Sequence, residues 1–456
     1  MSYRRKKLLA LFCATALSMT AVAGCTGTKS STGNVVSSET ETNAEETSAQ
    51  SEAGTFSSAD MFTERDLAGT YEESRAVYVT LSDDGITGET DGVVINGQTV
   101  TITAEGTYIF SGTLSEGQIV VDADNAKVQI VFDNVDITCA SSAAVYVKSA
   151  EKVFVTLAEG SQNTLRNTDE YVAIDDNNID AVIFAKSDLT LNGTGSLTIV
   201  SAEGHGIVSK DDLVLTSGTY VITSASHGLS GKDSVRIANG SYTIVSGKDG
   251  IHAQNKDDSS SGFVYLAGGT YTISAGDDGI HAASNVTISD GKIDITQSYE
   301  GIEGLSIDIA GGEISVLASD DGINAAGGND SSSSSEGFQG GDDQFASTEG
   351  AYIQISGGVL HVNASGDGID SNGDITVSGG ETYVSGPTND GNGSLDYNGS
   401  AQITGGIFAA SGSSGMAQNF DSSSTQGTIM VNIDEQEGNT AVSYTHLRAH
   451  ETCADL

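Results

Sequence analysis

The chain has 456 residues, of which 57 are glycine and only 1 is proline, and it contains no tryptophan. Its 62 acidic residues outnumber the 19 basic ones, so the formal net charge at pH 7 is −43. A surface this negative repels phosphate backbones, which excludes a nucleic-acid partner. A hydrophobic content of 37% excludes a wholly disordered acidic chain, because such chains lack the apolar residues for a core.

The N-terminus has the organisation of an export signal. A basic run, residues 4–7, precedes an apolar run, residues 8–23, which is too short for a comfortable membrane span. The apolar run ends in Val-Ala-Gly-Cys, which resembles the lipobox of bacterial lipoproteins and makes Cys25 the lipid attachment site. We expect residues 1–24 to be a lipoprotein signal peptide. The protein is then exported and held on the outer face of the cell membrane through its N-terminal lipid only, with ordinary secretion as the alternative.

The segment that follows, residues 25–58, is rich in Ser, Thr and Glu and has almost no large apolar side chains. Such a segment cannot bury enough surface to offset its ordering entropy, so we predict a disordered tether. Without residues 1–24, which carry four basic and no acidic residues, the net charge is −47. The remaining cysteines are too few for a disulfide framework, and Cys139, in a strand-like run, is predicted to be buried.

From about residue 190 the sequence repeats with a period near 22 residues. The markers of the repeat are glycines followed by Ile or Leu, at spacings of 22, 22, 29, 22, 21 and 46 residues: Gly206, Gly228, Gly250, Gly279, Gly301, Gly322 and Gly368. The two long spacings contain insertions, around residues 255–261 and over residues 326–349. A fixed period with insertions at one point of the unit is typical of a solenoid.

Within each unit apolar and polar residues alternate, which indicates strands. Two such strands and the short Gly-Ile segment give three strands per turn. We therefore predict an all-β fold, a right-handed parallel β-helix, with successive turns about 4.8 Å apart. Residues 59–189 are expected to be the N-terminal β part and cap, and residues 190–430 the regular turns with a disordered insert at 326–349. Residues 431–456 are expected to be a truncated end with a tail unlike the repeats, and the protein is expected to be a monomer.

One column of the repeat contains Tyr220, Tyr242 and Tyr271. Exposed, they would form a platform for stacking sugars, but the same column has Leu197 before them and Ile293 after them. A position that accepts Leu and Ile faces inward, so we predict a tyrosine ladder in the core. The outward positions on the same strands supply the expected carbohydrate contacts: Arg236, Tyr265, Gln354, His361 and Tyr383.

Two further columns flank the marker glycines and are rich in acids. The residues before the glycines form column 1: His205, His227, Asp249, Asp278, Glu300, Asp321 and Asp367. The residues two places after them form column 2: Val208, Ser230, His252, His281, Glu303, Asn324 and Asp370. Equivalent positions of a β-helix stack, and like charges about 5 Å apart repel by on the order of 3 kcal/mol at an effective dielectric near 20.

A divalent cation removes this repulsion, and calcium takes six to eight oxygen ligands. We therefore predict Ca²⁺ as the cofactor, held by these residues: Asp249, Asp277, Asp278, Glu300, Glu303, Asp320, Asp321, Asn324, Asp367 and Asp370. The alternative is a solvated acidic edge in which Asp-Gly only makes turns. The neighbouring His252 and His281 suit either a transition metal or hydrogen bonds to turn carbonyls.

Several long motifs resemble one family. They are Gly-Thr-Tyr-Ile-Phe-Ser-Gly at 106–112, Leu-Ala-Glu-Gly-Ser-Gln-Asn-Thr-Leu at 157–165, Gly-Thr-Gly-Ser-Leu at 193–197, Gly-Asp-Gly-Ile-Asp-Ser-Asn-Gly at 366–373, and the run 385–417. Together they make residues 75–430 similar to the calcium-containing, cellulose- and pectin-binding β-helix family of bacterial surface and secreted proteins. One departure is that His205 and His227 stand where that family has Asp.

The resemblance implies a polysaccharide-lyase-like fold with bound calcium and carbohydrate binding but no established catalysis. We expect an extracellular, calcium-dependent lipoprotein that binds plant cell-wall polysaccharide, cellulose or polygalacturonate, and that is not an enzyme. A pectate-lyase-like β-elimination is the enzymatic alternative, and it needs a Lys or Arg base beside calcium. The basic residues in reach of that role are Lys210, Lys232, Arg236 and Lys248. A non-catalytic adhesin or spacer is the third reading.

Overall fold

The computed structural model describes residues 58–88, 91–326 and 347–432. The signal peptide, Cys25 and almost all of the tether, the insert and the tail lie outside these residues. None of the helices in the described part is long and apolar enough to cross a bilayer.

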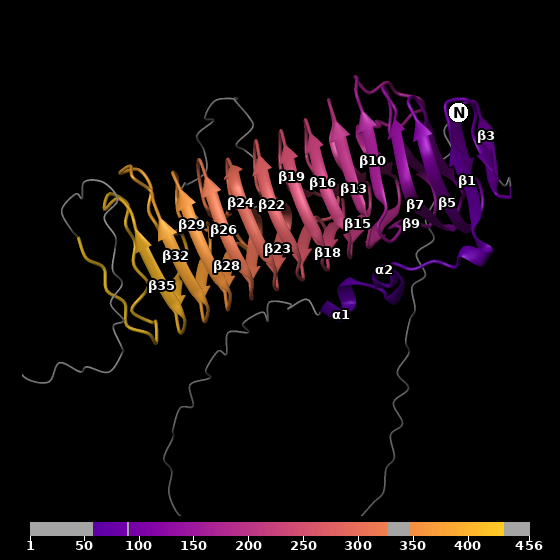
Figure 1. The fold of residues 1–456 in the computed structure, drawn as a ribbon. Helices are drawn as coiled ribbons and strands as arrows, with labels where there is room; N and C mark the ends of the chain where they lie inside the picture. Colours follow the sequence, from indigo (N-terminus) through magenta and orange to yellow (C-terminus); the bar gives the residue numbers. More distant parts are fainter. Residues whose placement is uncertain (1–57, 89–90, 327–346, 433–456) are drawn as a thin grey trace, which may run out of the picture. The chain divides into compact units, whose positions relative to one another are not determined.

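The fold is a parallel β-helix, as predicted, and its strands stack in three faces from β1 to β35 (Figure 1). Face 1 contains the C-terminal halves of β5 (Gly106–Leu114) and β7 (Lys127–Thr138), then β10 (Gln162–Asn167), β13 (Ser196–Ser201), β16 (Thr219–Ser224), β19 (Ser241–Ser246), β22 (Thr270–Ala275), β24 (Lys292–Ser298), β26 (Glu313–Ala318), β29 (Val359–Ala364), β32 (Glu381–Ser385) and β35 (Ile407–Ser411). Face 2 contains β4 (Thr99–Ile102), β6 (Gln118–Asp122), β8 (Val145–Ser149), β11 (Ala181–Ala185), β14 (His205–Ser209), β17 (Leu229–Gly231), β20 (Ile251–Ala253), the first halves of β23 (Ile280–Ile288) and β25 (Ile302–Ile309), then β27 (Ile323–Ala325), β30 (Ile369–Ser371) and β33 (Asp396–Tyr397). Face 3 contains β1 (Val77–Leu81), the first halves of β5 and β7, then β9 (Lys152–Leu157), β12 (Asp188–Gly193), β15 (Asp212–Leu215), β18 (Ser234–Ile237), β21 (Phe263–Leu266), the second halves of β23 and β25, then β28 (Tyr352–Ile355), β31 (Asp374–Val377) and β34 (Ala401–Ile403).

The parallel stacking therefore begins well before residue 190. Among the strands of the described residues, only β2 (Thr87–Gly88) and β3 (Val93–Asn96) pair antiparallel, with β1 and β4, at the N-terminal end. The insertions in the sequence fall between strands and leave the register of the rungs unchanged, since Ile309 still pairs with Ile355 across the long spacing.

The marker glycines are required where two rungs approach each other. The backbone N–H of Gly228 donates to the carbonyl of Asp249 on the next rung, and the same bond recurs from Gly250 to Asp278. A Cβ on Gly228 would lie 2.5 Å from Ile244 Cγ2 and 2.7 Å from the Gly250 carbonyl oxygen. Any larger residue would push the rungs apart, which explains the Gly-Ile motif.

The tyrosine ladder lies in the core, as predicted. Tyr220, Tyr242 and Tyr271 are at most 1% exposed, and their rings stack with centroids 5.2 and 5.0 Å apart. Tyr220 pairs in register with Leu197, and Tyr271 pairs with Ile293. Cys139 is also buried, at 4% exposure.

A segment that the sequence analysis did not anticipate covers part of face 3. This strap, residues 58–69, contains α1 (Ser58–Met61) and α2 (Glu64–Ala68), and a 3₁₀ turn (Glu73–Arg75) follows it. Its anchor is Asp66, which is 2% exposed. The Asp66 carboxylate pairs with Lys152 Nζ at 2.8 Å and accepts a hydrogen bond from Thr190 at 2.6 Å.

The strap covers two of the residues that were expected to contact carbohydrate. Tyr265 is 1% exposed and lies against Phe62, with ring centroids 6.1 Å apart. Arg236 donates to the carbonyl oxygen of Met61 at 3.0 Å and pairs with Asp212. Both side chains do point outward from the β-helix, but the strap takes the place that a sugar would need.

We predict that Asp66→Ala destabilises the protein by about 3 kcal/mol, because it leaves Lys152 nearly buried without its partner. The matched control is Asp122→Ala, which breaks an exposed pair with Lys148 and should cost less than about 1 kcal/mol. Urea unfolding of both variants measures the difference, and equal effects would contradict the anchoring role of Asp66.

Candidate metal and carbohydrate sites

The two acidic columns stack in the predicted register. In column 2, His252 pairs with His281, His281 with Glu303 and Glu303 with Asn324. Asn324 then pairs with Asp370. On each of these short strands of face 2 the flanking residues are buried, and all but Ser371 are apolar or glycine, so the column 2 side chain lies on the side away from the core.

Column 1 is tied together by backbone amides. The N–H of Asp278 donates to Asp249 Oδ1 at 3.2 Å, and the N–H of Glu300 donates to Asp278 Oδ1 at 3.3 Å. The same bond runs from Asp367 to Asp321 Oδ1 at 2.6 Å. Earlier in the column, His227 Nδ1 accepts from Asp249 at 3.2 Å. One acceptor atom of these side chains therefore holds the next rung, while the second oxygens of Asp249 and Asp278 lie near His252 and His281 in column 2.

The columns bring potential ligand atoms together in four clusters within the described residues. We call this series the ladder, and each cluster offers three ligand atoms within 4.8 Å of one another. The clusters are His227/Asp249/His252, Asp249/Asp278/His281, Asp278/Glu300/Glu303 and Asp321/Asp367/Asp370. Six of the ten predicted metal ligands fall in the carboxylate clusters, and a seventh, Asp249, lies in the histidine clusters.

Burial and mutual repulsion raise the pKa of several of these carboxylates in the metal-free protein. Burial, and then the charge of Glu303, raise the pKa of Glu300 to about 9. Burial, and then neighbouring carboxylates, raise the pKa of Asp321 to about 7 and that of Asp370 to about 8. Burial also raises the pKa of Asp278 to about 8, against its hydrogen bond with His281. A divalent cation supplies the positive charge that these groups otherwise obtain from protons.

The donor set of the two carboxylate clusters fits calcium. All six side chains offer oxygen only, and Asn324 lies between the clusters with its Nδ2 donating to Glu300 at 2.9 Å. Asn324 Oδ1 is buried and has no hydrogen-bond partner in the described part of the chain. A hard cation held by Glu300 and its neighbours would give this orphaned oxygen a partner, and would supply charge neutralisation there.

Besides Asn324, two predicted ligands stay outside the clusters, and two residues were missed. Asp277 is not brought into any cluster, and Asp320 hydrogen-bonds the Tyr299 hydroxyl, which raises the pKa of that phenol. Asp396 pairs with Asp370 and extends column 2 by one rung. It escaped notice because the marker glycine of its rung is replaced by Ser394. His227 was assigned no role, although it contacts Asp249.

Three of the expected carbohydrate contacts remain available. His361 on β29 and Tyr383 on β32 stack on the outer side of face 1, with ring centroids 5.1 Å apart. Gln354 on β28 is half-buried and pairs in register with Thr376. These residues stay predictions for sugar contact.

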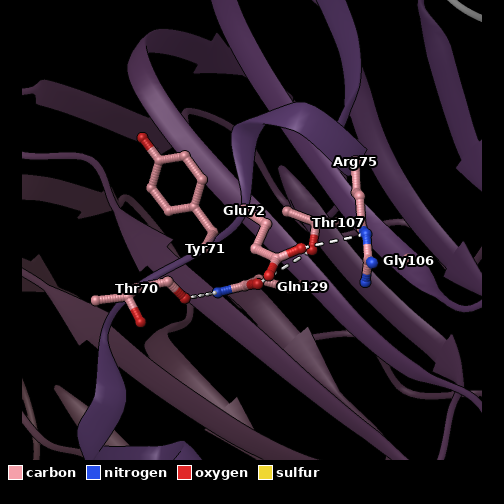
Figure 2. A pocket seen from close by; sticks show the side chains of 7 residues that line it. All are labelled: Thr70, Tyr71, Glu72, Arg75, Gly106, Thr107 and Gln129. Carbon is pink, nitrogen blue, oxygen red and sulfur yellow. Dashed lines mark hydrogen bonds and ion pairs between the residues drawn. The ribbon is translucent and has the colours of Figure 1, made fainter.

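A surface hollow of about 420 Å³ lies at the N-terminal rungs (Figure 2), beside the end of the strap. Its lining combines an aromatic ring, an exposed ion pair and hydrogen-bonding groups: Thr70, Tyr71, Glu72, Arg75, Gly106, Thr107 and Gln129. The amide of Gln129 already donates to the Thr70 carbonyl at 3.0 Å and accepts from Thr107 at 3.1 Å. The side-chain amide of Gln129 is therefore already hydrogen-bonded to other residues of the lining, and none of the lining residues belongs to the ladder.

The residues proposed for an elimination base are placed unfavourably. Lys232 pairs with Asp257 at 2.9 Å, and Arg236 is held between Asp212 and the strap. Lys210 lies over the ring of Phe184, 5.2 Å from its centroid. The fourth, Lys248, is exposed, next in sequence to Asp249. None of the four belongs to the rungs of the carboxylate clusters.

Comparison with known proteins gives three matches of different extent. A family model described as "Carbohydrate-binding domain-containing protein" matches residues 96–338. A relative from Acetivibrio thermocellus with the same description is 40% identical over 131 residues, 28% of this chain and 46% of the relative. The chain thus spans about half the length of that curated relative. A solved structure titled as a polysaccharide lyase-like protein from C. thermocellum, in a gadolinium derivative, has 33% identity and a TM-score of 0.45. The match covers 52% of this chain and 93% of the solved chain.

The raised pKa values predict how stability depends on pH. Groups whose pKa is raised by folding stabilise the protein at low pH, and this contribution is lost as the pH rises through the folded value. In chelator, the melting temperature should therefore fall between about pH 6.5 and pH 9, as Asp321, Asp370 and Glu300 lose their protons.

Histidines whose pKa is lowered by folding oppose this trend only below that window. Burial lowers the pKa of His252 to about 4 from 6.5, so the effect of this residue on stability changes with pH only below about pH 6.5. His281 adds to the fall instead: burial lowers its pKa, but hydrogen bonds to Asp278 and Glu303 outweigh burial and raise it to about 11. Excess Ca²⁺ should raise the melting temperature and flatten its fall with pH, because the ion replaces the protons. Scanning calorimetry at several pH values, with EDTA or Ca²⁺, measures both effects. A melting temperature in EDTA that is constant or rises across the window would contradict them.

Proposed function

Because this chain belongs to the family of carbohydrate-binding domain-containing proteins, as its sequence motifs predicted, we propose that it is a calcium-dependent polysaccharide-binding lipoprotein. Its place is the outer face of the cell membrane, and its ligand is an extracellular plant polysaccharide. The glycan is polygalacturonate or cellulose, and the protein binds it without cleaving it.

The observation that carries the calcium dependence is the difference in burial between the two carboxylate clusters. Asp278, Glu300 and Glu303 are at most 9% exposed, so an ion held there is enclosed by protein and stabilises the fold. Asp321, Asp367 and Asp370 are only half-buried. An ion at this second cluster keeps coordination positions open, and a carboxylate of the glycan can occupy them.

Charge favours the same arrangement. A protein with a net charge of −43, or −47 without its signal peptide, repels an acidic polysaccharide unless cations bridge the two. Between Lys292 and Arg448 there is no Lys or Arg that would attract a uronate directly. Calcium at the half-buried cluster therefore provides both the attraction and its location. Neutral glucans need only hydroxyl and stacking contacts, for which His361 and Tyr383 are the residues proposed.

We predict that Asp321→Asn combined with Asp367→Asn weakens both calcium and polygalacturonate binding by about tenfold or more. Asn retains the oxygen that accepts the amide of the next rung, so the change removes charge and spares the backbone bond. The control is Asp290→Asn, an exposed acid outside the ladder. Isothermal titration with oligogalacturonate, in Ca²⁺ and in EDTA, gives the affinities.

Two results would contradict this proposal in different ways. Unchanged oligogalacturonate binding in EDTA would remove the calcium dependence. A steady rise in ultraviolet absorbance from unsaturated products, abolished by Lys232→Ala, would show β-elimination and make the protein a lyase.

The lipid anchor is tested separately. Cys25→Ala should release the protein into the medium or leave an unprocessed precursor, because it removes the lipobox thiol that would receive the diacylglyceryl group. Fractionation and mass spectrometry of the N-terminal peptide decide the outcome. A wild-type protein that is soluble and unlipidated would refute the anchor.

A further inference from the structure

The donor atoms of the ladder change in kind along its length. The first cluster consists of His227, Asp249 and His252, whereas the last two consist of carboxylates alone. Calcium takes oxygen ligands, whereas imidazole suits zinc, copper, iron and nickel. The two ends of the ladder therefore fit different classes of ion.

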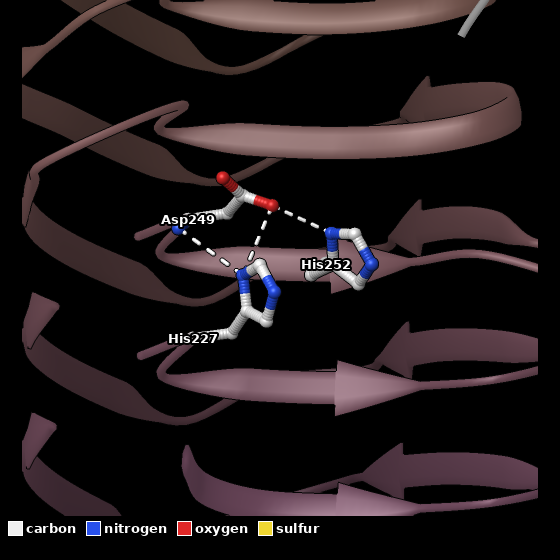
Figure 3. A group of neighbouring side chains, drawn as sticks. All are labelled: His227, Asp249 and His252. Carbon is white, nitrogen blue, oxygen red and sulfur yellow. Dashed lines mark hydrogen bonds and ion pairs between the residues drawn. The ribbon is translucent and has the colours of Figure 1, made fainter. Parts of the chain in front are cut away.

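In the first cluster both imidazoles approach the same carboxylate oxygen (Figure 3). His252 Nδ1 lies 2.5 Å from Asp249 Oδ2, and His227 Nδ1 lies 3.1 Å from it. The two rings are nearly parallel, with centroids 4.1 Å apart. The side chain of Asp249 is 2% exposed and those of the histidines are 13% exposed, so water competes little for these atoms. With neutral histidines the cluster carries one negative charge, which favours a divalent cation.

The contacts of His227 leave a conflict that a cation would resolve. The backbone N–H of Asp249 donates to His227 Nδ1 at 3.2 Å, so this nitrogen acts as an acceptor and carries no proton. Its approach to Asp249 Oδ2 then places two acceptors side by side. A hydrogen bond from His252 satisfies Asp249 Oδ2 but not this repulsion.

The next rung adds an independent observation. The ring of His281 stacks on that of His252, with centroids 5.0 Å apart, and its side chain is fully buried. His281 Nε2 has no hydrogen-bond partner in the described part of the chain. Buried polar atoms normally have a partner. The histidine end of the ladder therefore contains an imidazole nitrogen without a hydrogen-bond partner among the described residues. At the carboxylate end, the amide oxygen of Asn324 is in the same position.

We propose that His227, Asp249 and His252 hold a divalent transition-metal ion of the class of Zn²⁺ and Co²⁺. The second cluster shares Asp249 with the first and Asp278 with the third. Two divalent ions on neighbouring clusters would share a ligand and repel strongly, so the ions occupy alternate clusters. The transition metal thus takes the histidine cluster, and calcium takes Asp278/Glu300/Glu303.

Co²⁺ is the probe that tests this site, because its visible absorption reports its ligands. The experiment uses the full chain without an affinity tag, in saturating Ca²⁺. This protein should bind one equivalent of Co²⁺ at the His227/Asp249/His252 cluster, and the bound ion should absorb visible light. Zn²⁺ should displace it and further Ca²⁺ should not. His227→Asn combined with His252→Gln should weaken this Co²⁺ binding by at least tenfold. The control His361→Ala removes an exposed imidazole outside the ladder and should leave it unchanged.

The variants are chosen to keep the fold. Asn at position 227 offers an oxygen to the Asp249 amide, as Asp249 Oδ1 does for Asp278. Circular dichroism checks that the variant is folded. A second variant, His227→Asp combined with His252→Glu, gives the cluster carboxylate donors only. Its donors are then Asp, Asp and Glu, three carboxylates like those of the third cluster but with one Asp in place of a Glu. Because all three offer oxygen, the variant should lose the Co²⁺ absorption and gain one equivalent of Ca²⁺.

Three outcomes would overturn the proposal: no Co²⁺ absorption in the wild type, full displacement of Co²⁺ by Ca²⁺, or wild-type Co²⁺ affinity in the folded His227→Asn and His252→Gln variant. The last would place the ion elsewhere in the chain. Calcium-dependent glycan binding is measured on the same samples and is expected to persist in this variant. Failure of the transition-metal site is therefore distinguishable from failure of the proposed function.

Discussion

Stacking in strict register is the constraint on which the rest of this structure depends. Each side chain of a rung meets its equivalent on the next rung about 4.8 Å away, so any chemical property is repeated along the axis. For apolar residues the repetition is favourable, and it gives continuous columns of Ile, Val and Leu that are almost completely buried. For tyrosines it gives a stacked ladder whose hydroxyl groups reach backbone carbonyls, as from Tyr242 to Asn239 at 2.8 Å. For carboxylates the same repetition concentrates negative charge.

The ladder formed by the four clusters of columns 1 and 2 shows two ways in which the molecule accommodates that charge. One oxygen of Asp249, of Asp278 and of Asp321 accepts a backbone amide of the next rung, which fixes the side chain without neutralising it. The remaining oxygens converge on column 2, where burial and repulsion raise the pKa values of Glu300 and Asp370 to about 9 and about 8. Protons or cations must therefore accompany folding. The ladder changes from the buried Glu303 to the half-buried Asp367. In the function proposed above, this change would separate an ion that supports the fold from one that can bind a ligand.

The sequence was sufficient to predict the features that repeat. The Gly-Ile markers gave the period, and the substitution of Tyr by Leu and Ile in one column revealed its inward orientation. The register of both acidic columns follows from the same markers. The strap was missed because its contacts do not repeat: Asp66 meets Lys152 and Thr190 through single interactions between residues far apart in sequence. Tyr265 and Arg236 were consequently expected to be accessible. Asp396 was missed because its rung lacks the marker glycine.

Anomalous diffraction from crystals grown in calcium chloride tests the central claim, that cations neutralise the carboxylate columns. The account predicts calcium peaks at Asp278/Glu300/Glu303 and at Asp321/Asp367/Asp370, each surrounded by six to eight oxygens at about 2.3–2.6 Å. Absence of anomalous density at both clusters, with water or direct carboxyl–carboxylate hydrogen bonds in its place, would contradict it. Protons, and not cations, would then neutralise the carboxylate columns.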